Sequence, residues 1–261
     1  MKALQFKKKL IWTNNKNKIM TKISELQEII DNSNNIVFFG GAGVSTESGI
    51  PDFRSESGIF KTLEEYGTSP EELVSHSYYM EHTEEFFNYY KENLVFKDAE
   101  PNPAHLKLAE LENAGKLKAV ITQNIDGLHQ KAGSRNVLEL HGSIHRNYCQ
   151  ICGKGYDLNY ILESDGIPRC ECGGIIKPDV VLYEEPLNRN LLNDSFNYIS
   201  KADTLIIGGT SLVVYPAAGL IHNFIGSKLV LINKSETAYD SLASLVINEA
   251  IGETLEQIEI L

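Results

Sequence analysis

The stretch that decides the fold runs from Gly40 to Ser55 and reads Gly-Gly-Ala-Gly-Val-Ser-Thr-Glu-Ser-Gly-Ile-Pro-Asp-Phe-Arg-Ser. It directly follows the apolar run Ile-Val-Phe-Phe at 36–39, which is typical of a buried β-strand. Glycines at the end of a strand let the backbone turn tightly and come close to a ligand. A helix beginning at 44–48 would aim its free N–H groups at this turn and favour a phosphate there. The stretch therefore predicts the strand, turn and helix of a dinucleotide site.

The glycine pattern is a weak signal when it is taken alone. Gly41 and Gly43 are followed by Thr46 where the pattern G-x-G-x-x-G has its third glycine, so a tight turn without a ligand fits nearly as well. The tail at 51–54, Pro-Asp-Phe-Arg, favours a ligand, because a plain turn needs no acid, aromatic ring and arginine in that order. A structural role explains Asp52 at least as well as direct catalysis does, since aspartate also caps helices.

Length and charge exclude several classes of protein. The chain has 261 residues, which fits one large domain or a large domain with a small one. Its net charge of -11 argues against general binding of nucleic acids. No apolar run approaches the roughly 20 residues of a membrane-spanning helix. All four cysteines fall between 149 and 172, which argues against a disulfide-stapled secreted protein. We therefore expect a cytoplasmic protein without nucleic-acid or membrane partners.

The recurring pattern of strand, polar loop and helix predicts an α/β fold with a mostly parallel sheet. In an open sheet of this kind, the loops at the carboxyl ends of the strands gather in one crevice. We therefore expect one site to be lined by the polar loops at 40–55, 122–129, 141–143, 208–211 and 233–234. Strands are predicted at 36–39, 117–122, 137–140, 180–183, 204–207, 228–232 and 245–247. Helices are predicted at 21–30, 84–96, 103–115, 189–201, 216–221 and 252–260, with a further helix start near 69–72.

The cysteines form two close pairs, Cys149-x-x-Cys152 and Cys170-x-Cys172. Two such pairs separated by a loop are typical of a four-thiolate zinc site, although the second pair has one intervening residue where two are commoner. A redox-active pair or two disulfides are the alternatives. Zinc is favoured because all four thiols cluster in a chain without other cysteines. Four thiolates leave zinc no position for water, so the metal would be structural.

Taken together, these motifs resemble the sirtuin family. The resemblance rests on 41–45 (Gly-Ala-Gly-Val-Ser), 49–54, 122–126 (Thr-Gln-Asn-Ile-Asp), 140–142 (Leu-His-Gly), the cysteine pairs, 209–212 and 232–234. They occur in the family's order and span the chain from Ile36 to its end. The family's Phe-Gly-Glu segment appears here as Tyr-Glu-Glu at 183–185, without the glycine.

The resemblance implies an NAD-dependent protein lysine deacetylase whose partners are acetylated lysine side chains of proteins. The implied fold is a Rossmann-like, mostly parallel sheet with a small inserted zinc-binding domain. We expect a disordered leader at 1–19, which is basic and lacks a signal-peptide core. The catalytic region would then span 20–261, with a large NAD-binding domain, a zinc module around 145–180 and a helical part around 57–97.

The resemblance also implies the roles of single residues. His141 would be the general base and Asn124 a second catalytic residue; imidazole titrates near neutral pH and can accept the proton of a ribose hydroxyl. The acyl oxygen would attack the ribose of NAD, giving nicotinamide and O-acetyl-ADP-ribose. The expected zinc ligands are Cys149, Cys152, Cys170 and Cys172. The expected NAD contacts are Gly41, Ala42, Gly43, Ser45, Thr46, Phe53, Arg54, Gln123, Asn124, Ile125, Asp126, Gly209, Thr210, Ser211, Asn233, Lys234 and Ile251.

Two other functions fit the same residues. The first is mono-ADP-ribosyl transfer to a protein, which uses the same electrophile. The second is a non-enzymatic zinc-bearing binding module, although Asn124, Asp126 and His141 argue against it. By the resemblance, Phe87 and Tyr90 take the places of a tyrosine and an arginine that select succinyl and malonyl groups in one branch of the family. Their lack of charge predicts a preference for acetyl and other uncharged acyl groups.

Overall fold

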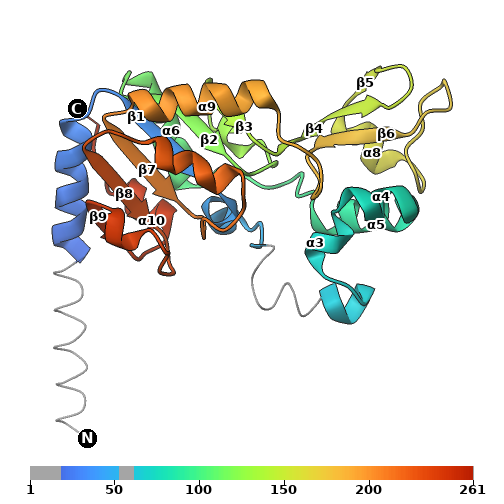
Figure 1. Cartoon of the computed structure of the whole chain (residues 1–261), viewed down its shortest axis with the longest axis horizontal. Helices are drawn as coiled ribbons and strands as arrows, with labels where there is room; N and C mark the ends of the chain where they lie inside the picture. The colour runs from blue at the N-terminus through green and yellow to red at the C-terminus, as the bar shows by residue number, and fades with distance from the viewer. Residues whose placement is uncertain (1–18, 53–61, 261) are drawn as a thin grey trace, which may run out of the picture.

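The structure, a computed structural model, describes residues 19–52 and 62–260, so positions 1–18 of the expected leader lie outside it. A six-stranded sheet forms the larger part of the molecule, in the order β3-β2-β1-β7-β8-β9 (Figure 1). All its neighbouring strands are parallel, which confirms the predicted α/β class. The strands are β1 (Ile36–Gly40), β2 (Leu117–Thr122), β3 (Val137–Glu139), β7 (Thr204–Gly208), β8 (Lys228–Ile232) and β9 (Leu245–Ile247).

The winding of this sheet reverses between β1 and β7. From β1 the chain moves outward through β2 and β3, and it then returns to pair β7 with the other side of β1. Phe39 of β1 therefore lies between Ile121 of β2 and Ile207 of β7. A parallel sheet wound in both directions has its ligand crevice outside the carboxyl ends of the strands at this reversal. Gly40 and Gly208 end β1 and β7 side by side at that point.

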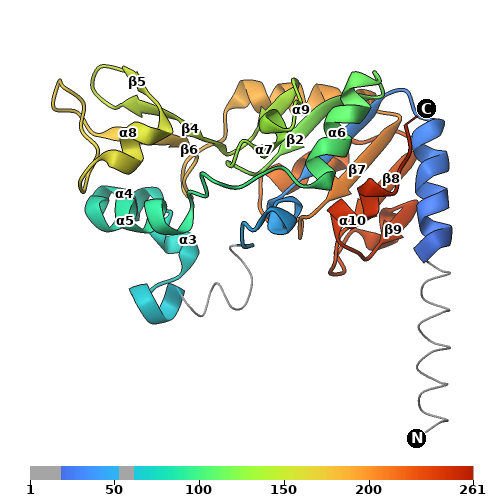
Figure 2. The same cartoon turned by 180° about the vertical axis from the view of Figure 1, so that it is seen from behind.

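Helices cover both faces of the large sheet (Figures 1 and 2). Successive side chains of a strand point to opposite faces, so Phe38 belongs to one core layer and Phe39 to the other. The layer of Phe38 contains a helix at 19–31, α6 (Pro103–Asn113), α7 (Leu128–Lys131) and α10 (Ile251–Glu256). The layer of Phe39 contains α9 (Arg189–Lys201) and the 3₁₀ segment η3 (Ala217–Asn223).

A small antiparallel sheet, in the order β5-β4-β6, lies at one end of the molecule (Figure 2). Four of the five aromatic side chains at 84–96 are buried beside it, with Phe86, Phe87 and Tyr90 at most 1% exposed, whereas Phe96 is only partly buried. The elements here are β4 (Gly142–Cys149), β5 (Gly155–Tyr156), β6 (Ile176–Val180), α8 (Leu158–Glu163), α3 (Pro70–Leu73), α4 (His76–Glu81) and α5 (Thr83–Asn93).

Several predicted elements are wrong or misplaced. The helix expected at 84–96 ends at Asn93, and the helix expected at 216–221 is the 3₁₀ segment η3. The helix expected at 44–48 is replaced by two 3₁₀ turns, η1 (Ala42–Val44) and η2 (Thr46–Ser48). The Val44 carbonyl accepts a hydrogen bond from the Asn102 side chain at 2.7 Å. In a continuing helix, this carbonyl would accept a main-chain N–H of the helix instead. The strand expected at 180–183 lies instead at β6, because the chain leaves the small sheet after Val180. The closing helix ends at Glu256 and does not reach 260.

Across residues 19–52 and 62–260, no helix combines the length and apolar character that crossing a membrane requires.

Candidate active site

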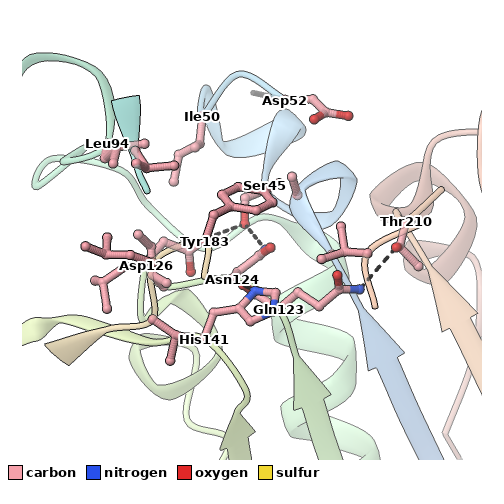
Figure 3. A pocket seen from close by; sticks show the side chains of 18 of the residues that line it. Ser45, Ile50, Asp52, Leu94, Gln123, Asn124, Asp126, His141, Tyr183 and Thr210 are labelled. Atoms are coloured by element: carbon pink, nitrogen blue, oxygen red, sulfur yellow. Dashed lines mark hydrogen bonds between the residues drawn. The ribbon is translucent and has the colours of Figure 1, made fainter. Parts of the chain in front are cut away.

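A cavity of about 320 Å³ opens at the carboxyl ends of β1, β2 and β7 (Figure 3). One wall consists of the polar turns that follow these strands. The rest of the lining is largely apolar and comes from the end of α5, from 180–187 and from 214–216. Sequence reasoning missed most of this apolar wall, because its residues, such as Leu94, Phe96 and Val214, carry no motif.

The polar wall contains most of the residues predicted to form the site. Four of the five polar loops contribute to it, and the loop at 233–234 does not. Gly43, Thr46 and Ile251 are not among the lining residues, and Ile251 is only 3% exposed. Phe53 and Arg54 lie outside the described residues. The predicted residues that line the cavity are Gly41, Ala42, Ser45, Gln123, Asn124, Ile125, Asp126, His141, Gly209, Thr210 and Ser211.

The two glycine turns at the ends of β1 and β7 are in direct contact. The Gly43 N–H donates to the Gly209 carbonyl at 2.8 Å. A Cβ atom at position 43 would lie 2.7 Å from the Gly209 Cα, and a Cβ at position 209 would lie 2.3 Å from the Val44 nitrogen. Gly209 also has a φ of +58°, in the left-handed region. These turns therefore require glycine, and they leave a backbone wall without side chains that fits a pyrophosphate.

A chain of side-chain hydrogen bonds connects three of the predicted residues. Asn124 Nδ2 donates to Ser45 Oγ at 3.0 Å, and Ser45 Oγ donates to Asp126 Oδ2 at 2.6 Å. The second Asp126 oxygen accepts the Leu128 N–H at the start of α7, at 2.9 Å. Asp126 thus also holds an N–H group at the start of α7. The same bonds fix the side chain of Asn124 within the cavity.

His141 lines the cavity just before β4. Its Nδ1 lies 3.0 Å from the main-chain oxygen of Gln123. A carbonyl oxygen only accepts hydrogen bonds, so we assign the proton of the neutral ring to Nδ1. Nε2 is then the basic atom of the ring. The Gln123 side chain donates to Thr210 Oγ1 at 3.2 Å, which connects the loops after β2 and β7 (Figure 3).

The glycine loop is also held from behind by Glu47, which sequence reasoning missed. Its carboxylate accepts the N–H groups of Gly252 at 2.7 Å and Glu253 at 3.2 Å, at the start of α10. The residue before α10 is Ala250, whose side chain cannot cap a helix. Glu47 and Gly252 are 205 positions apart, so no local pattern signals the contact.

Two histidines that match no motif form a buried pair in the large domain. His105 and His129 are at most 1% exposed, with ring centroids 4.8 Å apart. Burial lowers the pKa of His105 to about 4 and lowers that of His129 well below its ordinary value. His145 places its Nε2 3.0 Å from the Asp126 carbonyl. None of the three is among the described residues that line the cavity.

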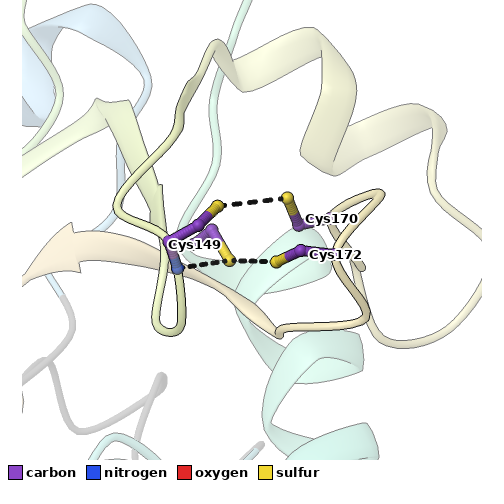
Figure 4. A group of neighbouring side chains, drawn as sticks. Cys149, Cys170 and Cys172 are labelled. Atoms are coloured by element: carbon purple, nitrogen blue, oxygen red, sulfur yellow. Dashed lines mark hydrogen bonds between the residues drawn. The ribbon is translucent and has the colours of Figure 1, made fainter.

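The four cysteines form a separate cluster in the small sheet (Figure 4). Their sulfur atoms all lie within 4.8 Å of one another, and the closest pairs are 3.4 and 3.6 Å apart. A disulfide needs about 2.05 Å, whereas four sulfurs bonded to one tetrahedral zinc lie about 3.8 Å apart. The Tyr156 hydroxyl donates to Cys170 and lowers the pKa of that thiol to about 6, which favours the thiolate that zinc binds. The cluster therefore fits a structural zinc ion.

Comparison with known proteins gives consistent matches. A sequence profile described as "Sir2 family" matches residues 41–216. The "NAD-dependent protein deacetylase" of Clostridium acetobutylicum is 61% identical over 242 residues, which cover 92% of this chain and 99% of that protein. The protein of the same name from Clostridium perfringens is 64% identical over 239 residues, covering 91% and 98% of the two chains.

Solved structures agree with these sequence matches. A Sir2 structure with a deacetylated p53 peptide and 3'-O-acetyl ADP ribose has a TM-score of 0.82 and 40% identity, and covers 90% of this chain and 96% of that one. A structure named "Sir2 bound to acetylated peptide" has a TM-score of 0.79 and 38% identity, with the same coverage of 90% and 96%.

Proposed function

The chain belongs to the Sir2 family, and from this premise we propose how its cavity works as that of an NAD-dependent protein deacetylase. The enzyme moves the acetyl group of an acetyl-lysine side chain to ADP-ribose and consumes one water molecule, which gives lysine, nicotinamide and O-acetyl-ADP-ribose. One observation supports this most strongly: His141 and Asn124 share one cavity with the contacting glycine turns of β1 and β7.

NAD, when bound, supplies a ribose carbon that accepts the acyl oxygen as the bond to nicotinamide breaks. The glycine turns at 41–43 and 209 would hold the pyrophosphate, since their backbones can approach it closely. We assign Thr210 and Ser211 to the phosphates and Gln123 and Asn124 to the nicotinamide ribose. The remaining assignments are Ile125 and Asp126 for the carboxamide, Asn233 and Lys234 for the adenosine ribose, and Ser45, Thr46, Phe53, Arg54 and Ile251 for further cofactor contacts.

We assign the role of general base to His141. Its Nδ1–H donates to the Gln123 carbonyl, which keeps the lone pair on Nε2. Nε2 can therefore take the proton of a ribose hydroxyl. The imidazolium that results keeps its hydrogen bond to Gln123, and this bond is stronger when its donor is charged. Asn124 positions the ribose, because Ser45 and Asp126 fix its amide.

The described lining suits an uncharged acyl group. It contains no lysine or arginine, and its acids are Asp52, Asp126, Glu184 and Glu185. Phe87 and Tyr90, which we expected at the acyl pocket, are buried in the aromatic core and are not part of the lining. Apolar residues at the end of α5, such as Leu94, lie in the lining instead. An acetyl group fits this wall, whereas a carboxylate would be desolvated without a partner cation.

The small module has a supporting role in this proposal. The zinc cluster contributes no described residue to the cavity lining, but β6 leads directly into the lining residues 180–185. We assign NAD binding to the large domain within 20–261. The zinc module around 145–180 and the helical part around 57–97 would hold the substrate side of the cavity. We place the enzyme in the cytoplasm, without nucleic-acid or membrane partners, and this is supported by the thiol state of its cysteines and its net charge of -11.

Mass spectrometry of an acetyl-lysine peptide, with and without NAD, tests this function. We expect deacetylated peptide, nicotinamide and O-acetyl-ADP-ribose in equal amounts, and only when NAD is present. ADP-ribose attached to protein, without deacetylation, would show the transferase activity instead. If an enzyme that is folded and contains zinc forms neither product, both the deacetylase and the transferase activity are refuted.

A further inference from the structure

Glu184 has an unusual backbone conformation at the edge of the cavity. It is exposed, belongs to the lining and follows Tyr183, which Figure 3 labels, in the chain. Its φ is +74°, in the left-handed region where residues with a side chain are disfavoured and glycine is the usual choice. Some other interaction must therefore hold Glu184 in this conformation.

The start of α4 provides that interaction. Glu184 Oε2 accepts hydrogen bonds from the Ser77 backbone N–H at 2.9 Å and from Ser77 Oγ at 2.6 Å. The neighbouring backbone is paired as well: the Tyr183 N–H donates to the Val74 carbonyl, and the His76 N–H donates to the Tyr183 carbonyl, each at 3.0 Å. These bonds fix the carboxylate of Glu184 in position. The Ser77 bonds also lower its pKa, so the group is ionised at neutral pH.

Among the acids of the lining, Glu184 is the one best placed to meet a substrate cation. Asp126 is already bonded to Ser45 and Leu128, and Asp52 is only partly exposed. Glu185 is only partly exposed and lies 3.2 Å from Lys177 Nζ. Glu184, in contrast, is exposed, and its Oε1 has no hydrogen bond to any described residue.

We propose that Glu184 makes this enzyme prefer protein substrates that carry a lysine or arginine beside the acetyl-lysine. The inference rests on the proposed deacetylase function and concerns the peptide segment that stays outside the cavity. When the acetyl-lysine enters the cavity, its neighbours along the peptide remain near the edge where Glu184 lies. A cation there meets a fixed carboxylate, with no lysine or arginine in the described lining to repel it. Exposed pairs of this kind change affinity by roughly two- to fivefold, and salt weakens them.

The test compares peptides with one acetyl-lysine flanked by arginine, alanine or glutamate, placed in turn at each of the two positions on either side. The readout is the ratio of kcat/KM between the arginine and alanine peptides, at low and at high salt. Glu184→Gln keeps the shape of the side chain and removes its charge. Glu81→Gln is the matched control, because Glu81 is exposed, lies on α4 and is not part of the lining.

We expect a ratio of roughly two to five at one or more positions, which falls at high salt and drops to about one in Glu184→Gln. Glu81→Gln should keep the ratio of the unmodified enzyme. Equal turnover of all peptides would refute the inference and leave the deacetylase function intact. A ratio that persists in Glu184→Gln would also refute it, even if that variant slowed every peptide. No NAD-dependent turnover of any peptide would refute the proposed function itself.

Discussion

Glu47 and Gly252 join the glycine loop to the last helix of the chain. The Glu47 carboxylate lies 2.7 Å from the Gly252 nitrogen and accepts a second N–H from Glu253. A carboxylate at this position satisfies N–H groups that a helix cannot bond internally. Because Glu47 lies between Ser45 and Gly49, the position of the loop depends on α10.

Glu47→Ala should therefore weaken NAD binding more than peptide binding. Loss of a capping interaction costs about 1 kcal/mol, which corresponds to a roughly fivefold rise in KM for NAD. KM for the acetylated peptide should stay unchanged, and Glu47→Gln should restore part of the loss because its amide oxygen still accepts. Steady-state kinetics with each substrate varied in turn measure this. Equal rises in both KM values would indicate a general loss of structure and contradict the prediction.

His141→Ala should abolish deacetylation and leave the fold intact. Removal of a general base typically costs 10²–10⁴-fold in rate, so we expect a loss of at least about 10²-fold. The side chain is only partly buried, so the melting temperature should change little. Turnover assays and thermal unfolding of the same preparations provide the check. Turnover near that of the unmodified enzyme would show that His141 is not the base.

The cysteine cluster should hold about one zinc ion per chain. Cys170→Ala should lose the metal and lower the melting temperature, and activity should fall indirectly. Tyr156→Phe removes only the hydroxyl that donates to Cys170, so it should keep the zinc and most of the activity. Elemental analysis and thermal unfolding measure these outcomes. Full stability of metal-free Cys170→Ala would contradict a structural role for the metal.

Acid should destabilise the protein through the buried histidine pair. The folded-state pKa of His105, about 4, lies below the ordinary value of 6.5, so the unfolded chain binds protons first as pH falls. Above pH 6.5 the pair makes its full contribution to the free energy of unfolding. Below pH 6.5 this contribution decreases, by about 3 kcal/mol for His105 at pH 4. Urea unfolding between pH 7 and pH 5 should show this loss. His129→Leu should reduce the slope, and an unchanged slope would mean that other groups cause it.

The enzyme should act on acetyl-lysine far better than on succinyl-lysine in the same peptide. The described lining offers no lysine or arginine, and a carboxylate desolvated without a partner costs several kcal/mol, on the order of a 10²-fold loss or more. Comparison of kcat/KM for the two acyl groups decides the matter. Equal or better turnover of the succinyl peptide would show that a cation reaches the pocket.

The sequence predicted the polar wall of the site because its signals are local. Gly41, Asn124 and His141 each follow a short apolar run, and parallel strands bring such positions to one edge of a sheet. The contacts that hold this wall join residues far apart in the chain. Asn102 to Val44 and Glu47 to Gly252 are examples, and no pattern within one segment signals either pair.

The helix expected at 44–48 failed for the same reason. Its residues are compatible with a helix, but the Asn102 side chain bonds the backbone of this segment and favours two 3₁₀ turns. Glu184 is a similar case, since its left-handed backbone depends on Ser77 of α4. Tertiary contacts outweigh local preference at both positions, and both lie at the cavity.

The pairing of β1 with β7 has a consequence for the synthesis of the protein. β1 leaves the ribosome early, but one of its two neighbours is incomplete until residue 208 has been made. Until then, one edge of this apolar strand exposes N–H and C=O groups that can pair with other chains. The crevice at the winding reversal thus forms late in translation. A nascent chain stalled before residue 204 would carry the glycine loop without the strand that completes it, and such chains should be especially prone to aggregation and proteolysis.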